Sequence, residues 1–259
     1  MKNKIKSFIF NLFGESTFSK FQAIYWVKRL RKNKFYEKEI DLLSRFVKPG
    51  SVSLDIGANF GQYTYPLSKL VGATGKVFSF EPANYTFKIL KNIVKKLKLT
   101  NVEIQNIALS DKNGEAEIIT PVCNSGMPNI GEAHLWNQKQ DKEGKRETVK
   151  VATLDNLILS SPFLNKVTFI KCDVEGAEML VFRGGRNLLS KYYPVILCEI
   201  EKRHTERYGY EPDALFTFFK DLGYKAFVFI SGRLVLVQGI QESAINYTFI
   251  HESFIDKNI

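Results

Sequence analysis

The sequence lacks the patterns that define several protein classes. No apolar run in the 259 residues approaches the roughly 18–20 residues of a membrane-spanning helix. The three cysteines, Cys123, Cys172 and Cys198, are odd in number and lack the spacing of metal ligands. Cys172 and Cys198 lie in apolar runs, which predicts small core residues in a reducing, cytoplasmic compartment rather than redox or nucleophilic groups.

Most of the chain also lacks an excess of one charge. The net charge is +10, but residues 1–48 hold nine Lys and three Arg against four acids, a net of +8. The remaining 211 residues are therefore near +2. Because binding of a nucleic-acid duplex favours a strongly basic surface, we expect no nucleic-acid partner for the main domain.

The basic N-terminus has a helical pattern. Five apolar residues recur at the spacing of one helical face: Ile5, Phe8, Ile9, Leu12 and Phe13. A signal peptide fits poorly, because Asn11 interrupts the short apolar run and no small-residue cleavage site follows. Three alternatives stay open: a helix packed on its own domain, a contact in a homodimer, and a peripheral contact of residues 1–30 with anionic lipid on the inner membrane surface.

Strand-like and helical segments alternate along the middle of the chain. Strands are predicted to end near residue 57 and to span 76–80, 101–109, 166–172, 193–200 and 224–230. Helices are predicted over 61–71 and 84–99, and from about residues 176 and 213. Two further strands, near 233–237 and 246–250, are close enough to pair antiparallel. This alternation predicts an α/β fold with a mostly parallel sheet and helices on both faces.

Residues 121–147 interrupt the alternation. They are polar, rich in Gly and Pro, and lie between two predicted short strands at 115–120 and 147–152. We expect a loop excursion beyond the sheet that serves as a substrate lid, since a lid excludes water from a reaction. His134 and Trp136 stand out in this segment, and Trp136 is a candidate for stacking on a sugar ring.

The stretch LDIGANFGQYT, residues 54–64, follows the first of these strands. Asp55, Gly57 and Gly61 give the pattern D-x-G-x-x-x-G, and Asn59 stands where a dinucleotide-binding G-x-G-x-x-G would have its second glycine. The glycines allow a tight turn and close approach of the backbone to a ligand. The Asp55 carboxylate would repel a pyrophosphate and attract a cationic ligand.

A second acid, Glu81, ends the next predicted strand, 20 residues after Gly61. There it can accept hydrogen bonds from both hydroxyls of a ribose. Ligands of open α/β sheets bind at the carboxyl ends of the strands, so Asp55 and Glu81 are expected at one site. This combination predicts a site for S-adenosylmethionine. One acid would attract its cationic group, the glycines would lie close to a small ligand, and the other acid would bind its ribose. The alternative is that Asp55 caps a helix and Glu81 is solvated.

Four segments, in order, carry a family resemblance: LDIGANFGQYT, VFSFEPAN, NVEIQNIALSDKNGEAE and FIKCDVEGAEMLVFRGG. They resemble the FkbM family of class I S-adenosylmethionine-dependent methyltransferases over roughly residues 50–230, and the D-V-E-G-A-E segment is the most specific part. The resemblance implies a Rossmann-like sandwich whose last strand is antiparallel. It also implies methylation of a hydroxyl on a sugar, glycan or secondary metabolite.

The resemblance also implies roles for single residues. The methionine end of the cofactor would be held by Asp55, Gly57, Asn59 and Gly61, the ribose by Glu81, and Asn106 would lie near the adenine. Residues 1–48 match no recognisable motif. We therefore expect a basic helical extension over 1–48 and a methyltransferase domain over 49–259.

The catalytic candidates follow the fourth and fifth strands of the predicted sheet. An alcohol must lose its proton during methylation, so a general base within reach helps. Asp173 ends the fourth strand, where a transferred methyl would point, Glu175 follows it, and His204 lies just past the fifth strand. The structural alternatives are that Glu175 is an acid at the start of a helix, that His204 is a surface residue, and that Glu178 faces solvent or caps locally. Clear metal ligands are lacking by spacing, so no metal site is predicted.

Other functions fit the sequence less well. A nucleotide-dependent oxidoreductase would need the absent G-x-G-x-x-G. A nucleic-acid methyltransferase would carry an N/D-P-P-Y/F type segment, whereas Cys172 here precedes Asp173 and Glu175, whose carboxylates would repel phosphates. Methylation of another small molecule and a non-catalytic membrane-surface protein stay as alternatives.

Overall fold

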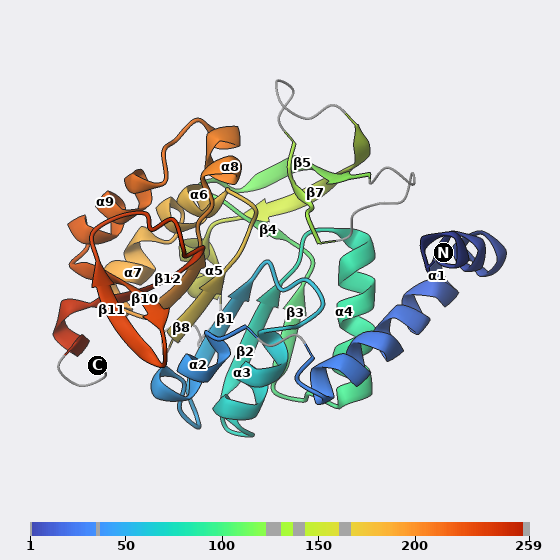
Figure 1. Ribbon diagram of the computed structural model, residues 1–259, viewed down its shortest axis with the longest axis horizontal. Helices are drawn as coiled ribbons and strands as arrows, with labels where there is room; N and C mark the ends of the chain where they lie inside the picture. Colours follow the sequence, from blue (N-terminus) through green and yellow to red (C-terminus); the bar gives the residue numbers. More distant parts are fainter. Residues whose placement is uncertain (1, 35–36, 123–130, 137–142, 161–166, 256–259) are drawn as a thin grey trace.

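The computed structural model describes residues 2–34, 37–122, 131–136, 143–160 and 167–255, with the side chains of residues 2–16 and 158–160 outside the description. Cys123 and parts of the excursion over 121–147 therefore lie outside the described residues. The described chain forms an eight-stranded sheet and a four-stranded sheet, with helices around the larger one (Figure 1).

The large sheet has the order β11-β10-β12-β9-β8-β1-β2-β3. Its strands are β1 (Val52–Ile56), β2 (Lys76–Phe80), β3 (Val102–Gln105), β8 (Val167–Cys172), β9 (Val195–Glu199), β10 (Tyr224–Ile230), β11 (Arg233–Val237) and β12 (Asn246–His251). Strands β3, β2, β1, β8 and β9 run parallel, and β12 runs antiparallel between β9 and β10. The predicted mostly parallel sheet with an antiparallel last strand is confirmed.

The central strands are buried because helices cover both faces. All five residues of β1 are buried, which is the burial pattern of a parallel strand between two helical layers. One face packs on α2 (Ile40–Phe46) and α3 (Thr64–Val71). The other packs on α5 (Leu154–Ser160), α6 (Glu178–Arg183), α7 (Arg186–Tyr192) and α9 (Asp213–Asp221). Cys172 and Cys198 lie fully buried in that second layer as free thiols, as predicted.

The predicted excursion contains more strand than the sequence indicated. Strands β4 (Ala108–Leu109), β5 (Gly114–Pro121), β6 (His134–Leu135) and β7 (Gly144–Ala152) form the second sheet, in the order β4-β7-β5-β6. The hairpin of β5 and β7 is long, and β6 adds to the edge of β5. The single strand expected over 101–109 is divided, because its first part joins the large sheet and β4 joins the second.

The pairing of the last strands also differs from the expectation. Strands β11 and β12 do not pair with each other. Each pairs antiparallel with β10, from opposite sides. The physical reason is that β12 fills the space between β9 and β10, so β11 is left at the edge of the sheet.

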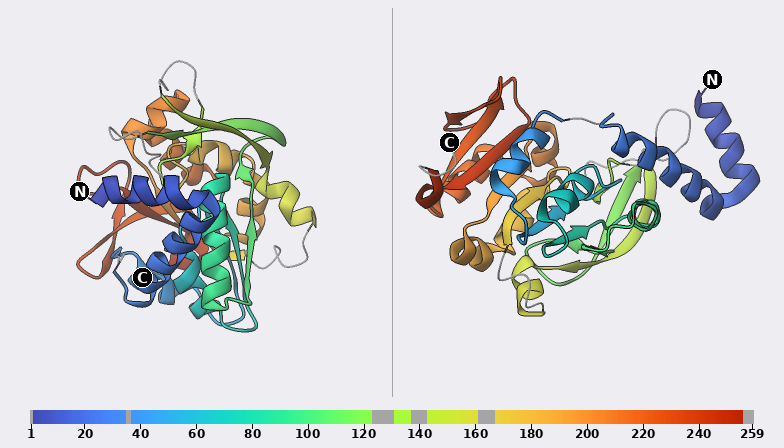
Figure 2. Two further views of the ribbon diagram at one scale, coloured as in Figure 1. Left: turned by 90° about the vertical axis from the view of Figure 1, so that its right-hand side faces the viewer. Right: turned by 90° about the horizontal axis from the view of Figure 1, so that it is seen from below.

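Helix α1 (Lys2–Arg31) runs beside α4 (Asn84–Leu97), and its first half is bent away from the body of the domain (Figures 1 and 2). Ala23, Val27 and Leu30 are buried against α4. The Trp26 ring stacks on Phe60, with the ring centroids 4.3 Å apart. The second half of α1 is thus fixed to the turn that follows β1.

We predict that Trp26→Ala loosens α1. Removing a half-buried indole should cost about 1–3 kcal/mol, below the full value for a core aromatic. Trypsin cleavage in α1, followed by mass spectrometry, should accelerate about tenfold or more, because local opening becomes easier. Phe21→Ala is the matched control, since Phe21 is 56% exposed on the same helix. Equal cleavage rates for the two variants would contradict the stacking contact.

Candidate active site

A cleft lies at the carboxyl ends of the central parallel strands. It is lined from the end of β1, from the end of β2, from the segment that leads into β4, from the residues after β8, and from the second sheet. Five of the predicted site residues line it: Gly57, Asn59, Glu81, Asp173 and Glu175. The wall formed by Ala133, His134 and Leu135 comes from the segment predicted as a lid.

The turn after β1 brings two strand ends together. Gly57, Asn59 and Gly61 all have positive φ angles, of 78°, 47° and 81°. A Cβ atom on Gly57 would lie 1.7 Å from the carbonyl oxygen of Asp173, so only glycine fits there. Gly57 therefore lets the end of β1 approach the end of β8, and the cleft depends on that approach.

Glu81 is held in a fixed orientation at the end of β2. Its two carboxylate oxygens accept hydrogen bonds from the backbone N–H groups of Asn59 and Ala83, each at 2.9 Å. The side-chain amide of Asn106 donates to the carbonyls of Glu81 and Pro82. Burial raises the pKa of Glu81 to about 7, against the lowering effect of the two backbone hydrogen bonds. Asn106 thus supports Glu81 rather than lining the cleft.

Asp55 and Gly61 lie behind the cleft. The Asp55 carboxylate is buried and accepts a hydrogen bond from the Thr64 hydroxyl. Burial raises its pKa to about 6. Gly61 packs under α4, where an added Cβ would meet Leu90 at 3.2 Å. Among the residues that the structure describes, neither lines the cleft, and both belong to the β1 strand end and the turn that follows it.

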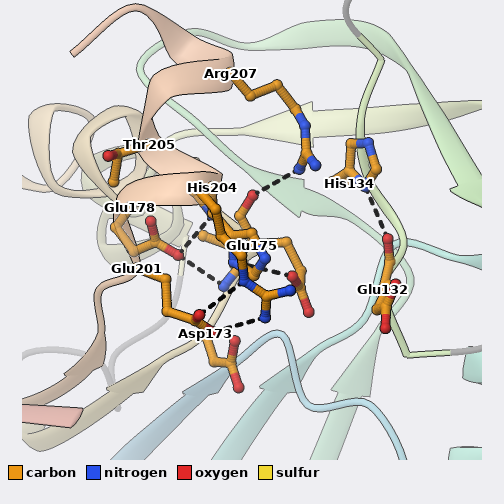
Figure 3. Close-up of polar contacts among 12 residues, drawn as sticks. Glu132, His134, Asp173, Glu175, Glu178, Glu201, His204, Thr205 and Arg207 are labelled. Atoms are coloured by element: carbon orange, nitrogen blue, oxygen red, sulfur yellow. Dashed lines mark hydrogen bonds and ion pairs between the residues drawn. The ribbon is translucent and has the colours of Figure 1, made fainter. Parts of the chain in front are cut away.

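The loop after β8 is built around a buried acid. Glu178 accepts hydrogen bonds from the backbone N–H groups of Val174 and Gly176, both at 3.1 Å (Figure 3). It is 2% exposed, so of its two expected alternatives the local cap is confirmed and solvent exposure is wrong. Burial raises its pKa to about 7. This cap holds Glu175 in a left-handed conformation, with a φ of 56°.

Glu175 and His204 form a pair beside the cleft. His204 Nδ1 lies 3.2 Å from Glu175 Oε2, and Arg207 donates to the Glu175 carbonyl at 3.2 Å (Figure 3). Burial, followed by the charge of Asp173, raises the pKa of Glu175 to about 8. Burial, followed by the charge of Arg203, lowers the pKa of His204. His204 is 9% exposed, so it is not the surface residue of the alternative reading.

Lys171 is a site residue that the sequence analysis missed. It is 1% exposed, its Nζ lies 3.7 Å from Asp173 Oδ2, and it donates to Asn246 Oδ1 at 3.5 Å. Burial alone would lower the pKa of Lys171, but the charges of Asp173 and Glu199 outweigh it and raise this pKa. The signal that the sequence offers is a charged residue inside the otherwise apolar run VTFIKC, residues 167–172.

Three residues could hold a cation. Ligand atoms of Glu199, Glu201 and His204 all lie within 4.8 Å of one another. The sequence predicts no metal site here, because the spacing of these residues gives no signal. Arg203 binds both carboxylate oxygens of Glu201, at 2.8 and 3.0 Å, and so occupies one member of the cluster.

Trp136 does not line the cleft among the described residues. Its ring lies under the guanidinium of Arg146, 4.9 Å from the ring centroid, and its backbone N–H donates to the Glu117 carbonyl. His134 from the same segment does line the cleft, and its Nδ1 lies 2.8 Å from the Glu132 carbonyl oxygen. The segment therefore contributes a wall through His134 rather than an aromatic platform through Trp136.

The cleft fits S-adenosylmethionine. The side-chain oxygen of Asn59 is buried and has no partner among the described residues, so it can accept a hydrogen bond from a ligand. Phe80, Ile107 and Leu109 line the cleft and offer an apolar surface for a flat base, and Glu81 lines it at the end of β2. The Asp173 carboxylate lines the cleft and can attract the cationic end of the cofactor.

Strand order and site geometry together define a class I methyltransferase: strands β3-β2-β1-β8-β9 run parallel, β12 inserts antiparallel, and the cleft opens at the carboxyl ends. A family model described as the Methyltransferase FkbM domain matches residues 55–226, more than half of the chain. The chain belongs to the FkbM methyltransferase family. Residues 55–226 therefore form an S-adenosylmethionine-dependent methyltransferase domain, which confirms the predicted family, cofactor and enzyme class.

Three single proteins that resemble this chain share low sequence identity with it. A probable cobalt-precorrin-6B C(15)-methyltransferase of Sulfurisphaera tokodaii is 28% identical over 57% of this chain and 74% of its own length. Methyltransferase 1 of Beauveria bassiana is 26% identical over 52% of this chain and 58% of its own length. A crystal structure of a methyltransferase FkbM from Methylobacillus flagellatus gives a TM-score of 0.45 at 13% identity, over 90% of this chain and 55% of that one.

No helix in the described part of the chain is both long and apolar enough to cross a membrane.

We predict that Glu178→Gln changes how stability depends on pH. The ordinary pKa of 4.5 rises to about 7 in the folded protein, so the folded state keeps a proton that the unfolded state releases in this window. The wild type should therefore lose stability relative to the variant as the pH rises from about 4.5 to about 7, and no further above it. Urea unfolding across this range measures the difference, with the exposed Glu242→Gln as the control. A constant difference would contradict a protonated Glu178.

Proposed function

We propose that this protein is an O-methyltransferase that acts on a hydroxyl group of a sugar, a glycan or a secondary metabolite. The observation that carries the proposal is the Asp173 carboxylate. It lines the cleft, its side chain is 34% exposed, and Lys171 holds it from behind at 3.7 Å. An exposed, oriented carboxylate suits a neutral hydroxyl acceptor, because it can accept the hydrogen bond of that hydroxyl.

Charge supports a neutral or cationic acceptor over a nucleic acid. Asp173, Glu175 and Glu199 lie together at the ends of β8 and β9. Burial and, after it, the charge of Asp173 raise the pKa of both glutamates. A phosphate backbone brought to this edge would meet like charge. The acidic edge thus favours a small-molecule or glycan acceptor, and the alternative is a nucleic-acid or other small-molecule methyltransferase.

The residues of the cleft divide into two groups in this proposal. Gly57, Asn59 and Glu81 hold the cofactor, which supplies an electrophilic methyl group when bound. Asp173 orients the acceptor hydroxyl in line with that methyl group and takes its proton as the new oxygen–carbon bond forms. The Glu175–His204 pair is the second candidate for the proton, since a base whose pKa lies near the working pH is the most effective. Positioning contributes up to roughly 7–11 kcal/mol to such a displacement.

We expect the purified protein to bind S-adenosylmethionine or its demethylated product in calorimetry. Glu81→Ala should weaken the binding by about 1.5–3 kcal/mol, because it removes a hydrogen bond to a charged group. Glu115→Ala removes an exposed glutamate from β5 and is the matched control. No binding of either ligand at millimolar concentration would overturn the proposed cofactor site, and equal affinity of the two variants would remove Glu81 from it.

Variants of the acids separate the two candidate bases. Asp173→Asn keeps the shape and should lower the methyl-transfer rate about 10²-fold or more at saturating cofactor if Asp173 is the base. His204→Ala should then cost much less. If the pair takes the proton, the rate should rise with pH through the pKa of Glu175, about 8, and Glu175→Gln should abolish that rise. A wild-type rate in all three variants would leave positioning as the whole mechanism.

A further inference from the structure

One face of α1 is exposed in the part of the chain that the structure describes. Three large apolar side chains within five residues are about half exposed there: Phe21 at 56%, Ile24 at 51% and Tyr25 at 53%. The opposite face of the same helix is the one that packs on α4 through Ala23, Val27 and Leu30. The exposed side chains are therefore not surplus core residues, and helix packing does not explain them.

Cations surround these apolar residues. Lys20, Lys28, Arg31 and Lys32 are exposed on the same side of α1, at helical spacing from Ile24. A groove beside them is lined by Ile24, Val27, Lys28, Arg31, Lys32 and Lys96, the last from α4. The sequence has no acid between Glu15 and Glu37, so nothing on this stretch of α1 neutralises the face. We call the exposed residues of this side the basic–apolar face; its members are Lys20, Phe21, Ile24, Tyr25, Lys28, Arg31, Lys32 and Lys96.

We propose that the basic–apolar face docks on the surface of a lipid bilayer that contains anionic lipid. Lys and Arg side chains around large apolar groups on one side of a helix match the boundary between head groups and acyl chains. The cations would meet the phosphates, and Phe21, Ile24 and Tyr25 would enter the boundary. The surface lies on α1 and α4, away from the acids of the cleft, so the inference does not depend on the proposed acceptor.

Charge argues against a second copy of the chain as the occupant. A twofold contact through this face would set it against itself, because twofold interfaces are self-complementary. Five cations would then oppose five identical cations, with no acid on either α1 stretch to compensate. A bilayer with anionic lipid offers the complementary charge instead, and its attraction falls off within a Debye length.

Vesicle co-sedimentation of the full chain tests the proposal. The probes are phosphatidylcholine vesicles and vesicles with about one-third phosphatidylglycerol, and we expect binding to the second only, weakened by added salt. Each Lys or Arg near an anionic surface contributes roughly fivefold in affinity, so Lys28→Glu with Arg31→Glu should weaken partitioning by at least about 25-fold. Phe21→Ser with Ile24→Ser should weaken it by about tenfold or more.

A matched control keeps the test specific. Lys220→Glu with Lys225→Glu makes the same charge change at exposed positions on α9 and β10, on the side of the domain away from α1 (Figure 1). This variant should retain vesicle binding within about threefold, because α9 and β10 lie on the other side of the domain from α1 and salt screens the attraction of distant exposed charges. All variants should melt at the wild-type temperature and bind S-adenosylmethionine as before, since the altered side chains are exposed.

Several outcomes would overturn the docking proposal. Absence of binding to anionic vesicles would do so directly, and equal losses in the α1 and control variants would reduce the effect to net charge. Binding of a homopolymer RNA in preference to vesicles, lost in Lys28→Glu with Arg31→Glu, would assign the face to nucleic acid. A dimer in sedimentation velocity that is lost in Phe21→Ser with Ile24→Ser, without vesicle binding, would assign it to a second copy.

Discussion

A lysine charge buried between strands is the constraint on which the active-site region depends. Lys171 is 1% exposed in β8, and burial of an unpaired ammonium would be strongly unfavourable. Asp173 at 3.7 Å and the charge of Glu199 compensate it, while Tyr63 lies with its ring 5.1 Å below the Nζ. The ends of β8 and β9 therefore have to carry acids, and Asp173 is fixed at the cleft as a partner of Lys171.

The acids of this region exceed the cations that the described chain places among them. Burial raises the pKa of Glu81 and Glu178 to about 7 and that of Glu175 and Glu199 to about 8. Such perturbed groups cluster at functional sites. A cofactor with a sulfonium and an amino group would supply the missing positive charge.

The sequence predicted the parts of the structure that follow local rules. The alternation of strands and helices could be predicted because it follows from hydrophobic periodicity. The turn with Gly57 and the position of Glu81 at the end of β2 could be predicted from the glycines and from the strand ends. The role of Lys171 could not be predicted, since its partners come from β12 and from beyond β8. The hydrogen bond from the Asn106 amide to the Glu81 carbonyl could not be predicted either, because side-chain direction at a strand end is set by tertiary contacts. Two strands of the second sheet were predicted, near 115–120 and 147–152, but β6 was missed because it has only two residues.

The position of β12 has a consequence for how the chain assembles. This strand is the last of the large sheet in the sequence, yet it lies between β9 and β10. Strands β10 and β11 emerge from a ribosome earlier but have no direct hydrogen bonds to β9, so they form only a hairpin until β12 arrives. During synthesis the open edge of β9 is a template for wrong pairing. The sheet therefore closes in one late step, and co-translational folding cannot complete it strand by strand.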